Sequence, residues 1–174
     1  MRNNNKNTSI FKMLRQNIRL MFTPRRLSPK HVAGPVISSE AETRPRSLFL
    51  RHLDCGSCNG CEMELNALSN PIYDIAQYGI RFESSPRHAD LLVMTGPYTR
   101  NLDEAAQLTA AAMPKTRIIT IGDCTQNGGV FQDSYAVIPK PEQIENAIEA
   151  HVPGCPPTPN EILNLLLTID PNPL

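Results

Sequence analysis

The sequence predicts an α/β protein whose main domain is a parallel sheet with helices on both faces. Short, continuous apolar segments at 47–53, 89–94 and 117–121 alternate with segments of helical periodicity. Continuous apolar runs are typical of parallel strands, because crossover helices bury both faces of the sheet. The length of 174 residues suits one ordinary domain. A hydrophobic content of 40% with zero net charge excludes a chain that is disordered throughout.

The other expected elements lie between and after these strands. A fourth, weaker strand is expected over 78–84. Helices are expected from near residue 61, over 102–113, over 142–150 and over 159–168. Strand and helix therefore alternate along most of residues 47–174, as in a series of right-handed crossovers.

The first 46 residues form a separate basic arm. They contain ten basic and two acidic residues, a net charge of +8, whereas the remaining 128 residues have a net charge of −8. Residues 9–22 have the periodicity of an amphipathic helix, with apolar side chains on one face and Lys or Arg on another. Residues 23–46 contain four prolines and are expected to be an extended connector. The predicted domains are thus 1–46 and 47–174.

A basic amphipathic helix fits an anionic membrane surface, a groove in a partner subunit, or the chain's own domain. Charges interrupt the apolar residues of this helix and no small-residue cleavage site follows it, so a secretory signal is not expected. No apolar run approaches the length of a membrane-spanning helix. Tryptophan is absent and Phe plus Tyr total nine, which disfavours a stacking surface for nucleic acid, and no nucleic-acid partner is expected.

All five cysteines fall in predicted loops that would lie at one edge of the sheet. Cys55, Cys58 and Cys61 follow the first strand, Cys124 follows the 117–121 strand, and Cys155 precedes the last helix. Ligands of open α/β sheets bind at the carboxyl ends of the strands. The sequence therefore predicts a cysteine-based site at this edge of the sheet.

Several kinds of cysteine chemistry were compared. A disulfide framework is disfavoured by the odd cysteine count and by a core large enough to need no cross-links. Structural zinc prefers two closely spaced pairs, whereas here one C-x-x-C pair is followed by two isolated cysteines. A thioredoxin-like pair would leave Cys124 and Cys155 unused, and a free-standing dinucleotide oxidoreductase would need a G-x-G-x-x-G motif that the chain lacks. An iron–sulfur cluster on four thiolates, with distant ligands, fits best.

Four motifs that occur in order point to a known family. They are the segments at 58–62, at 85–90, at 122–124 with Asn127-Gly128-Gly129, and at 152–158. Together they resemble the small subunit of membrane-bound [NiFe] hydrogenases and its relative in respiratory complex I, over roughly residues 47–170. The complex I branch has two adjacent cysteines in the first motif, whereas Cys58 and Cys61 are separated by two residues here. The chain therefore looks like the energy-converting hydrogenases of the formate hydrogenlyase, CO-induced and Ech-like types.

The resemblance implies a flavodoxin-like domain with one proximal [4Fe–4S] cluster. The implied ligands are Cys58, Cys61, Cys124 and Cys155, and Cys55 is left over. Arg87 and His88 match a segment that passes near the cluster in the family, where they would donate to its reduced form; the alternative is an exposed turn.

Three acids near the cysteines are less clearly assigned. Glu64 occupies a position where the family has an acid, either at the large-subunit interface in a proton route or as a solvated helix residue. Glu62 is less favoured for that role. Asp123 would place a carboxylate beside a negative cluster, which requires that it cap a turn or pair with a cation.

The implied function is one-electron relay without bond chemistry in this chain. Electrons would pass between a NiFe centre in a separate large subunit and a ferredoxin-like iron–sulfur subunit. The basic helix would attach the chain to a membrane-arm subunit, peripherally, on the cytoplasmic face of the inner membrane. The alternatives are a complex I-like quinone-reducing subunit with the terminal cluster, or a zinc-stabilised binding module.

Overall fold

The computed structural model describes residues 34–36 and 47–171. The helix predicted over 9–22, and most of the connector that follows it, lie outside the described residues. Within the described part of the chain, no helix has the length and apolar character needed to cross a bilayer.

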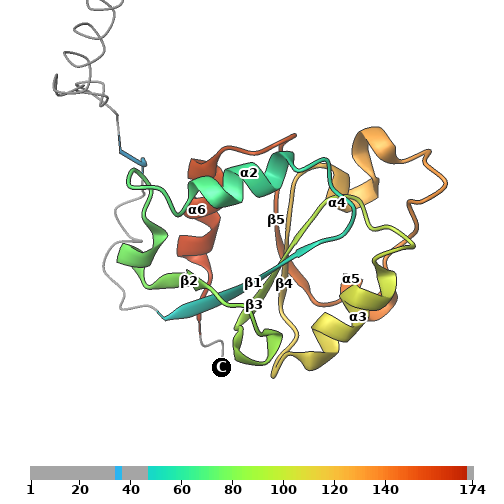
Figure 1. The fold of residues 1–174 in the computed structure, drawn as a ribbon, viewed down its shortest axis with the longest axis horizontal. Helices are drawn as coiled ribbons and strands as arrows, with labels where there is room; N and C mark the ends of the chain where they lie inside the picture. The colour runs from blue at the N-terminus through green and yellow to red at the C-terminus, as the bar shows by residue number, and fades with distance from the viewer. Residues whose placement is uncertain (1–33, 37–46, 172–174) are drawn as a thin grey trace, which may run out of the picture. The chain divides into compact units, whose positions relative to one another are not determined.

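A five-stranded sheet forms the centre of the domain (Figure 1). The strands are β1 (Leu48–Asp54), β2 (Ile80–Phe82), β3 (Leu91–Thr95), β4 (Ile118–Ile121) and β5 (Ile148–Val152). Their spatial order is β2-β1-β3-β4-β5, and every neighbouring pair is parallel. This is the order of flavodoxin-type doubly wound sheets, in which the direction of winding reverses beside the first strand. The predicted parallel sheet is confirmed.

Helices cover both faces of this sheet, as predicted (Figure 1). The α-helices are α2 (Gly60–Ala67), α3 (Asp103–Ala112), α4 (Cys124–Asn127), α5 (Glu142–Glu145) and α6 (Pro159–Thr168). Three short 3-10 helices are η1 (Ile75–Tyr78), η2 (Pro86–His88) and η3 (Gly129–Phe131). One core contains residues of α2 and α6, and the other contains residues of α3 and α5.

Strand β3 separates the two cores. Leu91 and Val93 belong to the core under α2 and α6, whereas Leu92 and Met94 belong to the core under α3 and α5. Successive side chains of a strand point to opposite faces, so an entirely apolar strand supplies both cores at once. All five residues of β3 are buried.

The helix predicted over 142–150 is wrong in its second half. It ends at Glu145, and Ile148–Val152 form the edge strand β5 on β4. Arg117, which is buried, donates through Nε and Nη2 to Glu149 of β5 at 2.7 and 2.9 Å. Strand pairing and this two-point ion pair join residues about thirty positions apart, and such contacts override local propensity.

The other predicted elements are present with shifted ends. The 78–84 strand shortens to three residues, and the helix that begins at Gly60 ends at Ala67. Of its expected apolar face, Leu65 and Leu68 are buried, but Met63 is 65% exposed.

Helix α6 begins where it was predicted to begin, because its start is encoded locally. Pro159 occupies the first turn, and Thr158 and Glu161 form a capping box. Glu161 Oε2 accepts from Thr158 N at 2.7 Å, which lowers the pKa of the Glu161 carboxyl, and Thr158 Oγ1 accepts from Glu161 N at 3.4 Å. The box fixes the start of α6 immediately after the loop that contains Cys155.

The α6 core contact can be tested by truncation. Leu163 is fully buried, so Leu163→Ala should lower the free energy of unfolding by about 2–5 kcal/mol. The matched control is Leu108→Ala, because Leu108 is a helical leucine that is 63% exposed; its change should stay within about 0.5 kcal/mol. Urea unfolding followed by circular dichroism measures both, and equal losses would contradict the assignment of the core.

Candidate functional site

Three loops at the carboxyl edge of the sheet bring the cysteines together. The first loop follows β1, the second follows β4, and the third follows β5. Because all these strands are parallel, their carboxyl ends lie at one edge. Cys61 and Cys124 are buried there, whereas Cys58 and Cys155 are exposed.

Gly122 lies between the sulfur atoms. It has a φ of +94°, and a Cβ added to it would lie 2.6 Å from Cys61 Sγ and 3.9 Å from Cys124 Sγ. A Cβ on Gly60 would lie 3.5 Å from Cys58 Sγ and 3.8 Å from Pro156, the neighbour of Cys155. The three loops therefore meet without intervening side chains.

The charges that act on the thiols come from the other members of the group. Burial, and then the charges of Cys124, Glu62, Cys58 and Cys155, raise the pKa of Cys61 to about 12. Burial also raises the pKa of Cys124, while a backbone N–H that hydrogen-bonds to this thiol lowers it. The charges of Cys155, Cys58 and Glu62 raise this pKa as well. Four thiolates here would repel one another strongly, and a cationic metal core would remove that repulsion.

Cys55 is not part of this group. It is buried in the core under α3 and α5, its N–H donates to Thr95 O at 2.9 Å, and its carbonyl accepts from Thr99 Oγ1 at 2.7 Å. Burial, and then the nearby Asp54, raise its pKa to about 12, while Lys140 acts in the opposite direction. Cys55 therefore has the surroundings of a structural thiol.

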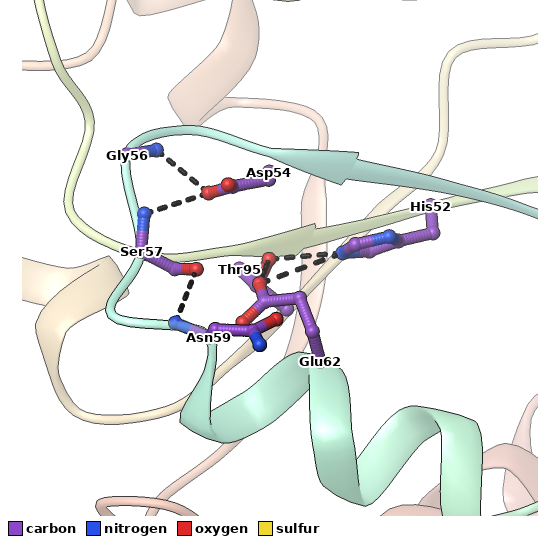
Figure 2. A network of polar contacts seen from close by, with 7 residues as sticks. All are labelled: His52, Asp54, Gly56, Ser57, Asn59, Glu62 and Thr95. Carbon is purple, nitrogen blue, oxygen red and sulfur yellow. Dashed lines mark hydrogen bonds and ion pairs between the residues drawn. The ribbon is translucent and has the colours of Figure 1, made fainter.

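Polar side chains hold the loop that precedes α2 (Figure 2). Asp54 Oδ1 accepts from the N–H groups of Gly56 and Ser57 at 2.8 and 2.7 Å. Ser57 Oγ then accepts from Asn59 N at 3.0 Å. These bonds fix the backbone on both sides of Cys58 before the helix begins.

Asp123 joins the second and third loops. Its Oδ1 accepts from Gly154 N at 2.7 Å, and its own N–H donates to Gly154 O at 2.9 Å. Both partners are neighbours of a cysteine, Cys124 and Cys155. Of the two arrangements that the sequence allowed for this carboxylate, the structure has the one in which it binds the backbone of a turn.

The structure does not bring Arg87 and His88 to the cysteines, contrary to expectation. Both are exposed in η2, immediately before β3. Because β3 is parallel to β1, its start lies at the amino edge of the sheet, opposite the cysteine loops. The five residues of β3 separate the two edges by roughly 16 Å.

The acid of α2 that joins a polar network is Glu62 rather than Glu64, the acid that the sequence favoured. Thr95 Oγ1 donates to Glu62 Oε1, and His52 Nε2 lies 3.7 Å from the same oxygen (Figure 2). The Glu62 side chain is 11% exposed, and its Oε2 is buried without a hydrogen-bond partner. Glu64 is half-buried. Sequence reasoning missed this group because its members come from β1, α2 and β3, and no local pattern links them.

The donor set fits an iron–sulfur cluster better than a single ion. Among residues 34–36 and 47–171, no three His, Cys, Asp or Glu side chains are close enough to hold one metal ion. Tetrahedral zinc would need its sulfurs about 4 Å apart, given Zn–S bonds of about 2.3 Å. A cluster of several irons is larger than one ion, and four thiolates are its usual protein ligands.

Fold and site together define a class: a doubly wound α/β domain with four cysteines at the carboxyl edge of its sheet. The chain belongs to the family described as "NADH ubiquinone oxidoreductase, 20 Kd subunit", which matches residues 58–169. Members of this family bind iron–sulfur clusters and are subunits of hydrogenase and other oxidoreductase complexes.

Two curated relatives are similar to the chain. It is 41% identical over 115 residues to "Formate hydrogenlyase subunit 7" of Escherichia coli, which covers 66% of this chain and 45% of that protein. It is 40% identical over 121 residues to "Probable membrane-bound hydrogenase subunit mbhJ" of Pyrococcus furiosus, which covers 68% and 71%. The chain thus spans less than half the length of the first relative.

A solved structure agrees in fold. A chain of the archaeal membrane-bound sulfane sulfur reductase matches with a TM-score of 0.58 and 26% identity. The match covers 74% of this chain and 73% of the other.

The close approach at Gly122 gives a test of the site. Gly122→Ala would place a methyl group 2.6 Å from Cys61 Sγ on a backbone with positive φ, at a cost of about 1–2 kcal/mol for the backbone alone. The iron content of the anaerobically purified protein should fall well below that of wild type.

Gly60→Ala is the matched control, because the added methyl would make only ordinary contacts with Cys58 Sγ at 3.5 Å and Pro156 at 3.8 Å. It should retain iron. Equal iron contents in the two variants would show that the Gly122 contact does not matter.

Proposed function

We propose that this chain is the electron-relay subunit of a membrane-bound [NiFe] hydrogenase complex. It holds one proximal [4Fe–4S] cluster on Cys58, Cys61, Cys124 and Cys155. The observation that carries the proposal is the grouping of these four thiols, with the fifth, Cys55, in a separate core. The similarity to hydrogenase subunits of two organisms supports the same conclusion.

When bound, such a cluster accepts and releases one electron at a time. The chain's own residues position its ligands. Asp54 and Asp123 fix the loops through backbone hydrogen bonds, and Gly122 leaves the space that the sulfurs need. Cys61 and Cys124 are buried while Cys58 and Cys155 reach the surface, so electrons can enter and leave across a short protein layer.

The partners we propose are a large subunit with the NiFe centre and a ferredoxin-like subunit. Exposed apolar side chains follow two of the ligands: Met63, two residues after Cys61, is 65% exposed, and Val130, six residues after Cys124, is 80% exposed. Exposed apolar residues near a redox site fit a protein interface.

A complex I-like role is the second candidate, and the family description itself favours it. Against it, Gly60 occupies the position, next to Cys61, at which that branch would have the adjacent cysteine. The hydrogenase role therefore has the better support.

The first experiment measures metal and redox state. Wild type and Cys55→Ala, purified anaerobically, should each contain about four irons and four acid-labile sulfides per chain, with one S = 1/2 EPR signal after dithionite reduction. Each alanine variant of the four proposed ligands should lose most of the iron. Zinc in place of iron would contradict electron transfer and support a zinc-binding module, whereas iron loss in Cys55→Ala would contradict only the ligand assignment.

The basic arm is proposed to attach the chain, peripherally, to a membrane-arm subunit on the cytoplasmic face of the inner membrane. Its net charge of +8 suits anionic headgroups or an acidic groove. Deletion of residues 1–22 should release the complex from isolated membranes while the iron content stays that of wild type. Full retention of the truncated protein in the membrane fraction would show that the arm is not the attachment.

A further inference from the structure

The Glu62 carboxylate, on a side chain that is 11% exposed, is not explained by ligand binding or by folding. Glu62 follows Cys61 directly, and its charge acts on both Cys61 and Cys124. These two cysteines lie in different helices, α2 and α4, so the charge of Glu62 acts on more than the cysteine next to it in sequence. A negative charge at that place opposes further negative charge on the site.

In the described part of the chain, no Lys or Arg nitrogen lies within 4.0 Å of Glu62, and its one ion-pair neighbour is His52. Burial lowers the pKa of His52, more than the nearby Glu62 raises it, so the imidazole is neutral at pH 7. Arg51, the next residue in the strand, instead donates through Nη1 to Ser84 O at 2.9 Å.

Hydrogen bonds fix the position of the Glu62 side chain. Thr95 has one hydroxyl hydrogen, which goes to Glu62 Oε1, so Thr95 Oγ1 accepts from His52 Nε2–H at 2.9 Å. The chain His52–Thr95–Glu62 therefore runs in one direction and leaves the proton on His52 Nε2 (Figure 2). It fixes the carboxylate at the end of β3, beside the start of the cysteine loops.

We infer that Glu62 is a fixed negative charge that lowers the reduction potential of the cluster bound by the four cysteines. The inference rests on the proposed cluster and adds a residue that acts on it through space. Reduction adds one electron to a site that is already negative, and net charge and burial are among the factors that set such potentials. A lower potential makes the reduced cluster a better electron donor.

The test compares potentials of the purified, iron-loaded complex by EPR-monitored redox titration. Glu62→Gln keeps the shape and the hydrogen-bond acceptor but removes the charge, so the midpoint potential should rise. Glu62→Asp, which retains the charge, should stay closer to wild type. Glu64→Gln is the matched control on the same helix: Glu64 is not among the charges that act on Cys61 or Cys124, so its shift should be smaller.

Ionic strength distinguishes this role from a surface effect. The Glu62→Gln shift should persist at high salt, because a charge that is 11% exposed is poorly screened. A shift that disappears at about 1 M salt, where the Debye length is about 3 Å, would contradict the inference, as would an unchanged or lower potential.

A second variant settles the case in which Glu62→Gln does not retain iron. His52 and Glu62 line the same cavity, of about 400 Å³, so His52→Lys has room for an ammonium group beside the intact carboxylate. The ammonium group would offset the negative charge of Glu62, so the midpoint potential of the cluster should rise. A midpoint potential equal to that of wild type would overturn the inference. Absence of iron from the wild-type chain would instead contradict the proposed function, so the two failures are distinguishable.

Discussion

The parallel direction of the strands is the constraint on which the site depends. β1, β4 and β5 all end at the same edge, so the loops that follow them meet although their cysteines are far apart in sequence. An antiparallel neighbour would place one loop at the other edge. The two apolar cores that bury both faces of the sheet therefore also position the ligands.

Within that edge, backbone contacts bring the loops closer than side chains would allow. Gly122 has the positive φ and the missing Cβ that the Cys61 sulfur requires. Asp123 binds the loop of Cys155 through Gly154. The result is a group of thiols whose burial and mutual repulsion favour the protonated form. Binding of a metal core must therefore displace protons, and its affinity is linked to pH.

Negative charge is concentrated at this edge in two layers. The thiolates would bind the metal core directly, and Glu62 lies just behind them on the hydrogen-bonded chain through Thr95 and His52. The first layer determines which cofactor fits, whereas the second affects the energy of an added electron. Cys55, which directly follows β1, packs in the core under α3 and α5 and belongs to neither layer.

The sequence by itself determined the parallel sheet, the start of α6 and the position of four cysteines after strands, with Cys55, Cys58 and Cys61 after β1 and Cys124 after β4. These features depend on apolar periodicity, on the Thr158–Glu161 capping box and on order along the chain, which are local. Only the tertiary structure decided that 148–152 is a strand, that Arg87 and His88 lie at the opposite edge, and that Glu62 bonds to Thr95. Those outcomes depend on strand direction and on contacts between residues about thirty or more positions apart, such as Arg117 with Glu149 and Glu62 with Thr95, which no local pattern encodes.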